Sequence, residues 1–188
     1  MRILGIDPGL RVTGYALLTV DATQPRLAEG GTLSTAAREP LAARLATLMR
    51  DMETVVRENQ PDCVAVEAVH SRAPFPQSAI LLSHARGVLL AVAAAQGLEV
   101  WEYTAADIKK SVTGHGAASK EQVARMIEHR LGVKQPIAPD HVTDAAAAAF
   151  CHWASLRAAE HEVAPSLYAA TAPGDVSTGR HHALGSSR

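Results

Sequence analysis

The 188-residue chain is poor in cysteine and in aromatic residues, and it has almost no net charge. Its two cysteines, Cys63 and Cys151, lie far apart without metal-ligand spacing, which argues against a disulfide scaffold or a zinc ribbon and favours a cytoplasmic protein. No apolar run reaches the roughly 18 residues that cross a bilayer, and the N-terminus lacks the hydrophobic stretch of a signal peptide. We therefore expect no membrane association.

The charge balance also limits the function. A formal net charge of −1 excludes a protein held on nucleic acid by bulk positive charge, but not one with a local basic face. With 47% hydrophobic and 20% charged residues, the chain has enough apolar material for one core. Residues 164–188 are dominated by alanine, serine, threonine, glycine and proline. We predict one domain over residues 1–163 and a flexible tail over 164–188.

Hydrophobic periodicity predicts an α/β fold. Strands come first along the chain and then alternate with helices, which favours a five-stranded mixed sheet with helices on both faces. The predicted strands cover residues 2–7, 13–20, 26–33, 63–67 and 98–103. The predicted helices cover residues 41–56, 78–96 and 105–112, with a fourth that starts at Ser119 and a fifth from about 140 to 160.

Two carboxylates end predicted strands. Asp7 closes the first strand and Glu67 closes the fourth. If these strands pair side by side and parallel, their backbones lie about 4.8 Å apart, so both carboxylates can share one site. Like charges this close repel unless one is protonated or both bind a cation, and oxygen ligands favour Mg²⁺ or Mn²⁺.

The start of the last helix offers further ligands. His141 and Asp144 are three residues apart and therefore point from one face, with Asp140 just before them. Asp7, Glu67, His141 and Asp144 together suit two-metal attack of water on a phosphodiester. His141 has an alternative role in proton transfer, because imidazole titrates near neutral pH.

Each of these residues also has a simpler interpretation. Asp7 begins Asp-Pro-Gly, a good turn sequence, and Glu67 suits a solvated strand edge. Asp140 suits a helix N-cap, and His141 suits a surface or capping position. The case for a metal site therefore depends on the combination of strand-end and helix-start residues.

Basic residues suggest a nucleic-acid contact. All four lysines, Lys109, Lys110, Lys120 and Lys134, lie in one short stretch, and Gly114-His115-Gly116 precedes a helix start that suits a phosphate. The loop after Glu67 adds His70, Arg72 and Phe75; an aromatic residue between two prolines can stack on bases. The alternatives are a solvated helix face for the lysines and a packed side chain for Phe75.

Several of these motifs, in order, resemble RuvC-type Holliday-junction resolvases. The resemblance covers about 160 residues and is carried by residues 1–15, 64–67, 84–88, 102–103, 108–110, 112–116, 119–120 and 140–145. It implies a ribonuclease H-like fold and a homodimeric endonuclease that makes paired, symmetric nicks in four-way junctions during recombination and repair. It also implies a partnership with a branch-migration motor of the RuvA and RuvB type.

The resemblance assigns roles to single residues. The family's metal-binding positions fall on Asp7, Glu67, His141 and Asp144, which would hold two Mg²⁺ or Mn²⁺ ions. Its DNA-contacting lysines fall on Lys109 and Lys120, and we add Lys110. The family often carries a phenylalanine wedge where this chain has His70, so the 70–76 loop, with Arg72 and Phe75, is expected to open the junction. The predicted helix over 78–96 is a candidate for the two-fold interface or for the core.

Three other functions share parts of this sequence pattern. An actin-like ATPase or sugar-kinase lobe also begins with a glycine-rich strand and an aspartate, but it needs two lobes and a second phosphate loop. A non-cutting junction-binding module would not need four metal ligands. A nuclease that cuts RNA or acts like a transposase would use the same ligand set, so junction preference comes from the resemblance.

Overall fold

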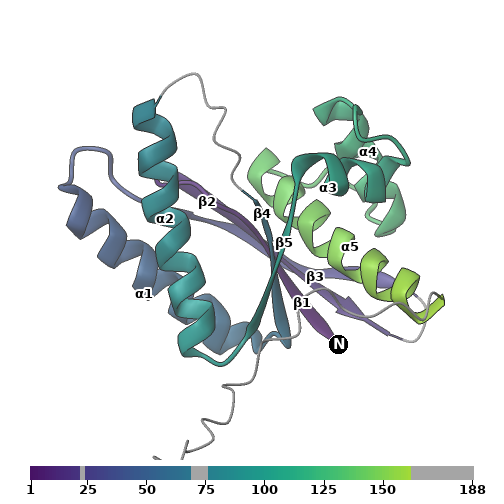
Figure 1. The fold of residues 1–188 in the computed structure, drawn as a ribbon, viewed down its shortest axis with the longest axis horizontal. Helices are drawn as coiled ribbons and strands as arrows, with labels where there is room; N and C mark the ends of the chain where they lie inside the picture. Colours follow the sequence, from purple (N-terminus) through teal and green to yellow (C-terminus); the bar gives the residue numbers. More distant parts are fainter. Residues whose placement is uncertain (22–23, 69–75, 162–188) are drawn as a thin grey trace, which may run out of the picture.

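The computed structural model describes residues 1–21, 24–68 and 76–161 (Figure 1). Its centre is one five-stranded sheet of order β3-β2-β1-β4-β5, which confirms the predicted mixed sheet. The strands are β1 (Arg2–Asp7), β2 (Val12–Val20), β3 (Pro25–Ser34), β4 (Cys63–Glu67) and β5 (Glu99–Tyr103). The predicted tail and the segment carrying His70, Arg72 and Phe75 lie outside the described residues.

Strand pairing brings the two predicted carboxylates to one edge of the sheet. β1 pairs antiparallel with β2 and parallel with β4, and β4 pairs parallel with β5. In the β1–β4 ladder Ile6 is opposite Val66. Asp7 and Glu67 are the next residues of their strands, so both follow the same rung at the carboxyl ends of neighbouring parallel strands.

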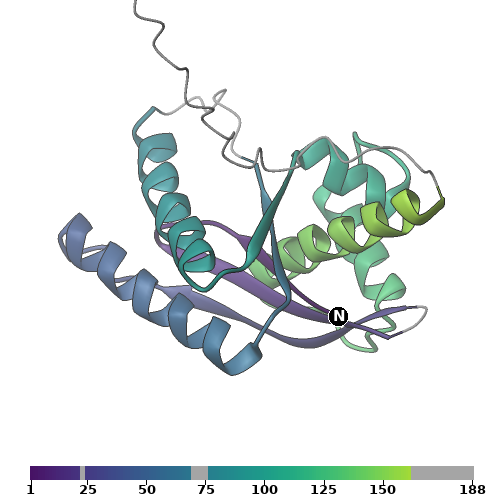
Figure 2. The same ribbon diagram turned by 60° about the horizontal axis from the view of Figure 1, so that its bottom comes forward.

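Helices cover both faces of the sheet, as predicted (Figures 1 and 2). Side chains of β1 alternate between two buried clusters, because successive residues of a strand point to opposite faces. The helices are α1 (Leu41–Asn59), α2 (Pro76–Ala95), α3 (Ala105–Thr113), α4 (Lys120–Arg130) and α5 (Asp140–His161). Ile3 belongs to the cluster with α5, and Leu4 and Ile6 belong to the cluster with α1 and α2.

The α5 helix packs directly on the centre of the sheet. Every residue from Ala145 to His152 is buried, and five of these are alanines in a row. A Cβ atom added to Gly5 would lie 1.9 Å from the carbonyl oxygen of Ala145. The alanine run and the glycine therefore allow the helix backbone to approach β1 more closely than larger side chains would permit.

The α2 helix is different, because only a small part of it is buried within the single chain. Its window Gln77–Ala95 has a mean hydropathy of 1.6 and is only 22% buried. By length and composition alone it passes for a membrane span, so our expectation that no segment would do so is wrong. Ser78, Ser83 and Arg86 interrupt the apolar run without lowering its average enough. Apolar core helices of soluble proteins pass the same test, so this helix alone is weak evidence for a membrane span.

Capping boxes mark the starts of α4 and α3. The predicted capping box at α4 is present: Gln122 N donates to Ser119 Oγ, and Ser119 N donates to Gln122 Oε1. A second capping box, between Thr104 and Asp107, starts α3 and was not predicted. Both boxes fix the direction of the helices that carry Lys109, Lys110 and Lys120.

Candidate active site

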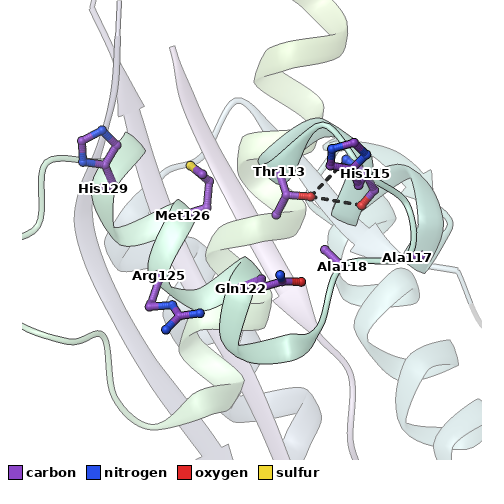
Figure 3. Close-up of a pocket in the computed structure, with 8 residues that line it drawn as sticks. All are labelled: Thr113, His115, Ala117, Ala118, Gln122, Arg125, Met126 and His129. Carbon is purple, nitrogen blue, oxygen red and sulfur yellow. Dashed lines mark hydrogen bonds between the residues drawn. The ribbon is translucent and has the colours of Figure 1, made fainter.

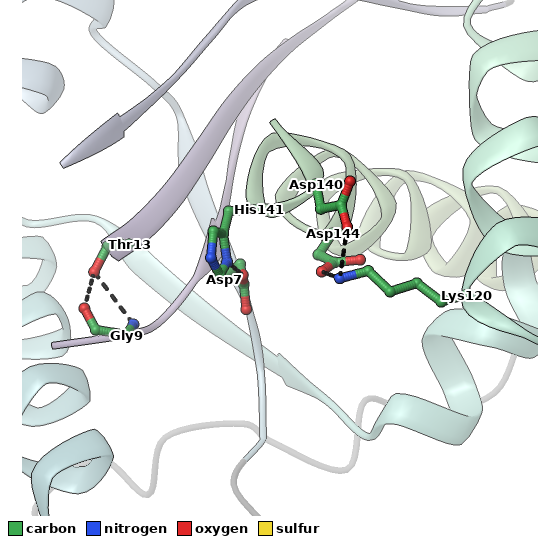
Figure 4. A network of polar contacts seen from close by, with 7 residues as sticks. All are labelled: Asp7, Gly9, Thr13, Lys120, Asp140, His141 and Asp144. Carbon is green, nitrogen blue, oxygen red and sulfur yellow. Dashed lines mark hydrogen bonds and ion pairs between the residues drawn. The ribbon is translucent and has the colours of Figure 1, made fainter. Parts of the chain in front are cut away.

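The centre of the site is a contact between the end of β1 and the first turn of α5. Asp7 Oδ2 lies 2.6 Å from Nδ1 of His141, although 134 residues separate them in sequence (Figure 4). The Asp7 side chain is half-buried and that of His141 is more open. A short hydrogen bond of this kind fixes the imidazole ring relative to the carboxylate.

A second contact joins the start of α4 to the same turn of α5. Lys120 Nζ lies 2.9 Å from Asp144 Oδ2 and 3.6 Å from Asp140 Oδ2 (Figure 4). These bonds raise the pKa of Lys120, chiefly through the hydrogen bond to Asp144. The ammonium group therefore stays charged and faces the acidic end of α5.

The two contacts belong to one electrostatic site. Burial raises the pKa of Asp7, the hydrogen bond from His141 lowers it, and the negative charge of Asp144 raises it again. The positive charges of His141 and Lys120 lower it to a smaller extent. Asp7 is thus a desolvated carboxylate close enough to a second carboxylate to be repelled by it, which is the condition that favours a bound cation.

Backbone packing positions these side chains. A Cβ atom at Gly14, which pairs with Asp7 across the β1–β2 ladder, would lie 2.1 Å from the carbonyl oxygen of His141. The turn between β1 and β2 is held by buried Thr13, whose hydroxyl donates to Gly9 O and accepts from Gly9 N. We had not predicted a role for Thr13 or Gly14, although both belong to the sequence motif around Asp7.

The predicted ligands share this region but do not form a ready metal cage. Glu67 ends β4 next to Asp7 in register. Asp7 is bonded to His141, and Asp144 is bonded to Lys120. Among residues 1–21, 24–68 and 76–161, no three histidine, cysteine, aspartate or glutamate side chains are arranged to hold a metal ion. The donor types, carboxylate oxygen with one imidazole, nevertheless fit a hard divalent cation.

Comparison with known proteins gives the family. The family model for crossover junction endodeoxyribonuclease RuvC matches residues 3–152. The chain belongs to the RuvC family. RuvC from Bordetella avium is 45% identical over 152 residues, which cover 81% of this chain and 83% of that protein. RuvC from Moorella thermoacetica is 41% identical over 166 residues, covering 87% and 99%.

Solved RuvC structures agree. Thermus thermophilus RuvC has a TM-score of 0.77 with this chain at 31% identity, covering 84% of this chain and 96% of that one. T. thermophilus RuvC in complex with Holliday junction substrate has a TM-score of 0.76 at 29% identity, over the same shares. The ribonuclease H-like fold is therefore confirmed. The protein is a Holliday-junction resolvase, a crossover junction endodeoxyribonuclease, which decides against the actin-like ATPase and the non-cutting module.

The lysines predicted to contact DNA occupy two different settings in this RuvC-family protein. Lys109 and Lys110 lie on α3, half-buried and exposed respectively. Lys120 instead forms ion pairs within the site, a contact that we had not predicted. The capping sequence at Ser119 could have indicated it, because it places Lys120 in the first turn of α4.

Proposed function

We propose that this resolvase cuts four-way junctions with two Mg²⁺ ions per active site, for which Mn²⁺ can substitute. Asp7, Glu67, His141 and Asp144 would hold the ions. The observation that carries the proposal is the meeting of Asp7, His141 and Asp144 at the carboxyl end of β1. When bound, the ions supply an activated water nucleophile and stabilise the leaving oxygen.

The side chains of the chain have further tasks in this reaction. In the alternative role of His141, Asp7 would hold its Nδ1 and the other ring nitrogen, rather than binding an ion, would accept or return a proton. Lys120 has its ammonium group beside Asp144, where it can exchange a carboxylate partner for a phosphate oxygen of the DNA. Lys109 and Lys110 would hold the DNA backbone nearby, without reading its sequence.

The junction itself imposes a two-fold arrangement. A four-way junction has near two-fold symmetry, so two matched nicks require two matched sites. We propose a homodimer in which the exposed face of α2 forms the interface. The segment with His70, Arg72 and Phe75 would then enter the junction centre, and a motor of the RuvA and RuvB type would move the junction in the cytoplasm. Residues 164–188 would form a flexible tail.

The test is cleavage of a synthetic four-way junction beside a linear duplex and an RNA–DNA hybrid, with and without Mg²⁺ or Mn²⁺. Symmetric nicks on the junction alone, only with metal, are expected. Asp7→Asn should abolish cutting while junction binding persists. Asp21→Asn is the matched control, because Asp21 is exposed and lies outside the site. Cutting by folded Asp7→Asn protein, or preferential cutting of the hybrid, would contradict the proposal.

A further inference from the structure

A pocket of about 630 Å³ lies between the end of α3 and the outer face of α4 (Figure 3). Gln122, Arg125, Met126 and His129 supply the α4 wall; they are exposed and recur at three- and four-residue steps along one side of the helix. Of the described residues that line it, none is acidic. The opposite side of α4 is buried through Val123 and Ile127, so the pocket faces away from the core.

The opposite wall is held in place by Thr113. Its hydroxyl donates to Lys109 O at 2.8 Å and accepts from His115 N at 3.2 Å, which ties the end of α3 to the loop carrying His115 (Figure 3). Thr113 follows Lys109 and Lys110 by one helical turn. The pocket therefore adjoins the side of α3 that carries Lys109 and Lys110, and does not form a separate surface.

The local charge favours an anion. Residues 109–134 contain six lysines and arginines but two glutamates, in a chain whose net charge is −1. Of the six, Lys120 is paired with Asp144 and Asp140, and Arg130 donates a hydrogen bond to Val112 O. Both glutamates are engaged: Glu121 accepts a hydrogen bond from Ser119 Oγ, and Glu128 accepts one from Ile137 N. The hydrogen bond from Ser119 is the main cause that lowers the pKa of Glu121, and the positive charge of Arg125 adds to it to a smaller extent. An exposed pair of this kind screens an arginine only weakly.

We propose that this pocket binds a backbone phosphate of a DNA arm, with Arg125 as the main contact and His115 and His129 beside it. The inference rests on the proposed function and extends its DNA surface from α3 across α4. Arginine suits this role because its planar guanidinium binds phosphate oxygens with two parallel hydrogen bonds. The contact carries no sequence information, so it should act on junction and duplex alike.

The experiment measures DNA affinity against salt for the full-length chain with Asp7→Asn, which separates binding from cutting. Adding Arg125→Gln should reduce the steepness of log K against log salt by about one and weaken binding about eightfold at 0.1 M salt. His129→Gln should give a smaller loss of affinity than Arg125→Gln. The matched control is Arg50→Gln, because Arg50 is an exposed arginine on α1, on the other side of the sheet.

Two DNA substrates keep the outcomes apart. Equal effects of Arg125→Gln on a four-way junction and a linear duplex, with Arg50→Gln unchanged, would support the phosphate site. If Arg125→Gln and Arg50→Gln have the same affinity and salt dependence on both substrates, the proposal is wrong. If the parent protein shows no preference for the junction, the proposed function fails, but the duplex measurement still decides about Arg125.

Discussion

The two faces of the sheet are packed in contrasting ways. On one face α5 is buried along most of its length, and glycines at β1 and β2 let its backbone touch the strands. On the other face α2 buries only one side, through Ala85, Leu89 and the residues around Val92, and leaves Ile80 56% exposed. The α5 face thus builds the candidate active site from close backbone contact, whereas the α2 face leaves apolar side chains exposed in the single chain.

The largest effect is expected from a methyl group added on the α5 face. Gly5→Ala would place a Cβ atom 1.9 Å from Ala145 O, so α5 or β1 must shift. We expect a loss of about 3 kcal/mol in the free energy of unfolding, measured by urea denaturation. Gly87→Ala on α2 is the control: a Cβ atom there meets nothing within 4 Å, and alanine favours a helix. If Gly5→Ala and Gly87→Ala lower the free energy of unfolding equally, the difference in packing between the α5 face and the α2 face would be contradicted.

The sequence indicated the strands and helices because their signals are local. The Asp-Pro-Gly turn, the apolar runs and the capping box at Ser119 each lie within a few residues, and the structure confirms the elements they predict. The strand ends bearing Asp7 and Glu67 could be predicted to share an edge once parallel pairing was assumed. The prediction of the site therefore depended on the assumed parallel pairing of these two strands, and not on any single residue.

The pairing of side chains could not be predicted in the same way. Asp7 meets His141, and Lys120 meets Asp144, because α5 rests on Gly14 and α4 starts beside it. Such contacts depend on how closely helix and sheet approach. Hydrophobic periodicity does not specify the distance between helix and sheet. Only glycines such as Gly5 and Gly14 indicate a close approach.

A smaller effect is expected from His152, a buried histidine on the α5 face. His152 Nδ1 lies 2.8 Å from the Tyr103 hydroxyl, and its ring stacks on Trp101. Burial lowers the pKa of His152 to about 4, so the unfolded chain takes up its proton first as the pH falls. This contribution to stability is complete above about pH 6.5 and decreases as the pH falls toward 4.

Between pH 7 and pH 5 the loss attributable to His152 should be about 2 kcal/mol. Urea unfolding of the wild type and of His152→Gln at pH 7 and pH 5 isolates the contribution of His152, because the other titrating groups are common to both proteins. Glutamine keeps a polar partner for Tyr103 and removes the titration. An equally steep pH dependence in the variant would show that His152 is not the group responsible.

A smaller effect is expected at the start of α4, which delivers Lys120 to the active site. Ser119→Ala removes the side-chain acceptor for Gln122 N and should cost about 1 kcal/mol in the free energy of unfolding. Ser83→Ala on α2 is the matched control, because Ser83 is exposed and its hydroxyl donates to Ala79 O within its own helix. If Ser83→Ala lowers the free energy of unfolding as much as Ser119→Ala does, the N-cap hydrogen bond of Ser119 does not stabilise α4 specifically.

The smallest effect on the folded chain, and the most informative about the α2 face, is expected from Ile80→Lys. Ile80 is largely exposed, so the substitution should change the stability of the single chain by less than about 0.5 kcal/mol. If α2 forms a two-fold interface, however, it places two like charges in an apolar contact. The wild type should then melt at a higher temperature as its concentration rises, and the variant should not. Sedimentation of both proteins gives the oligomeric state directly, and a wild type that remains monomeric throughout would leave the α2 face without a second copy to cover it.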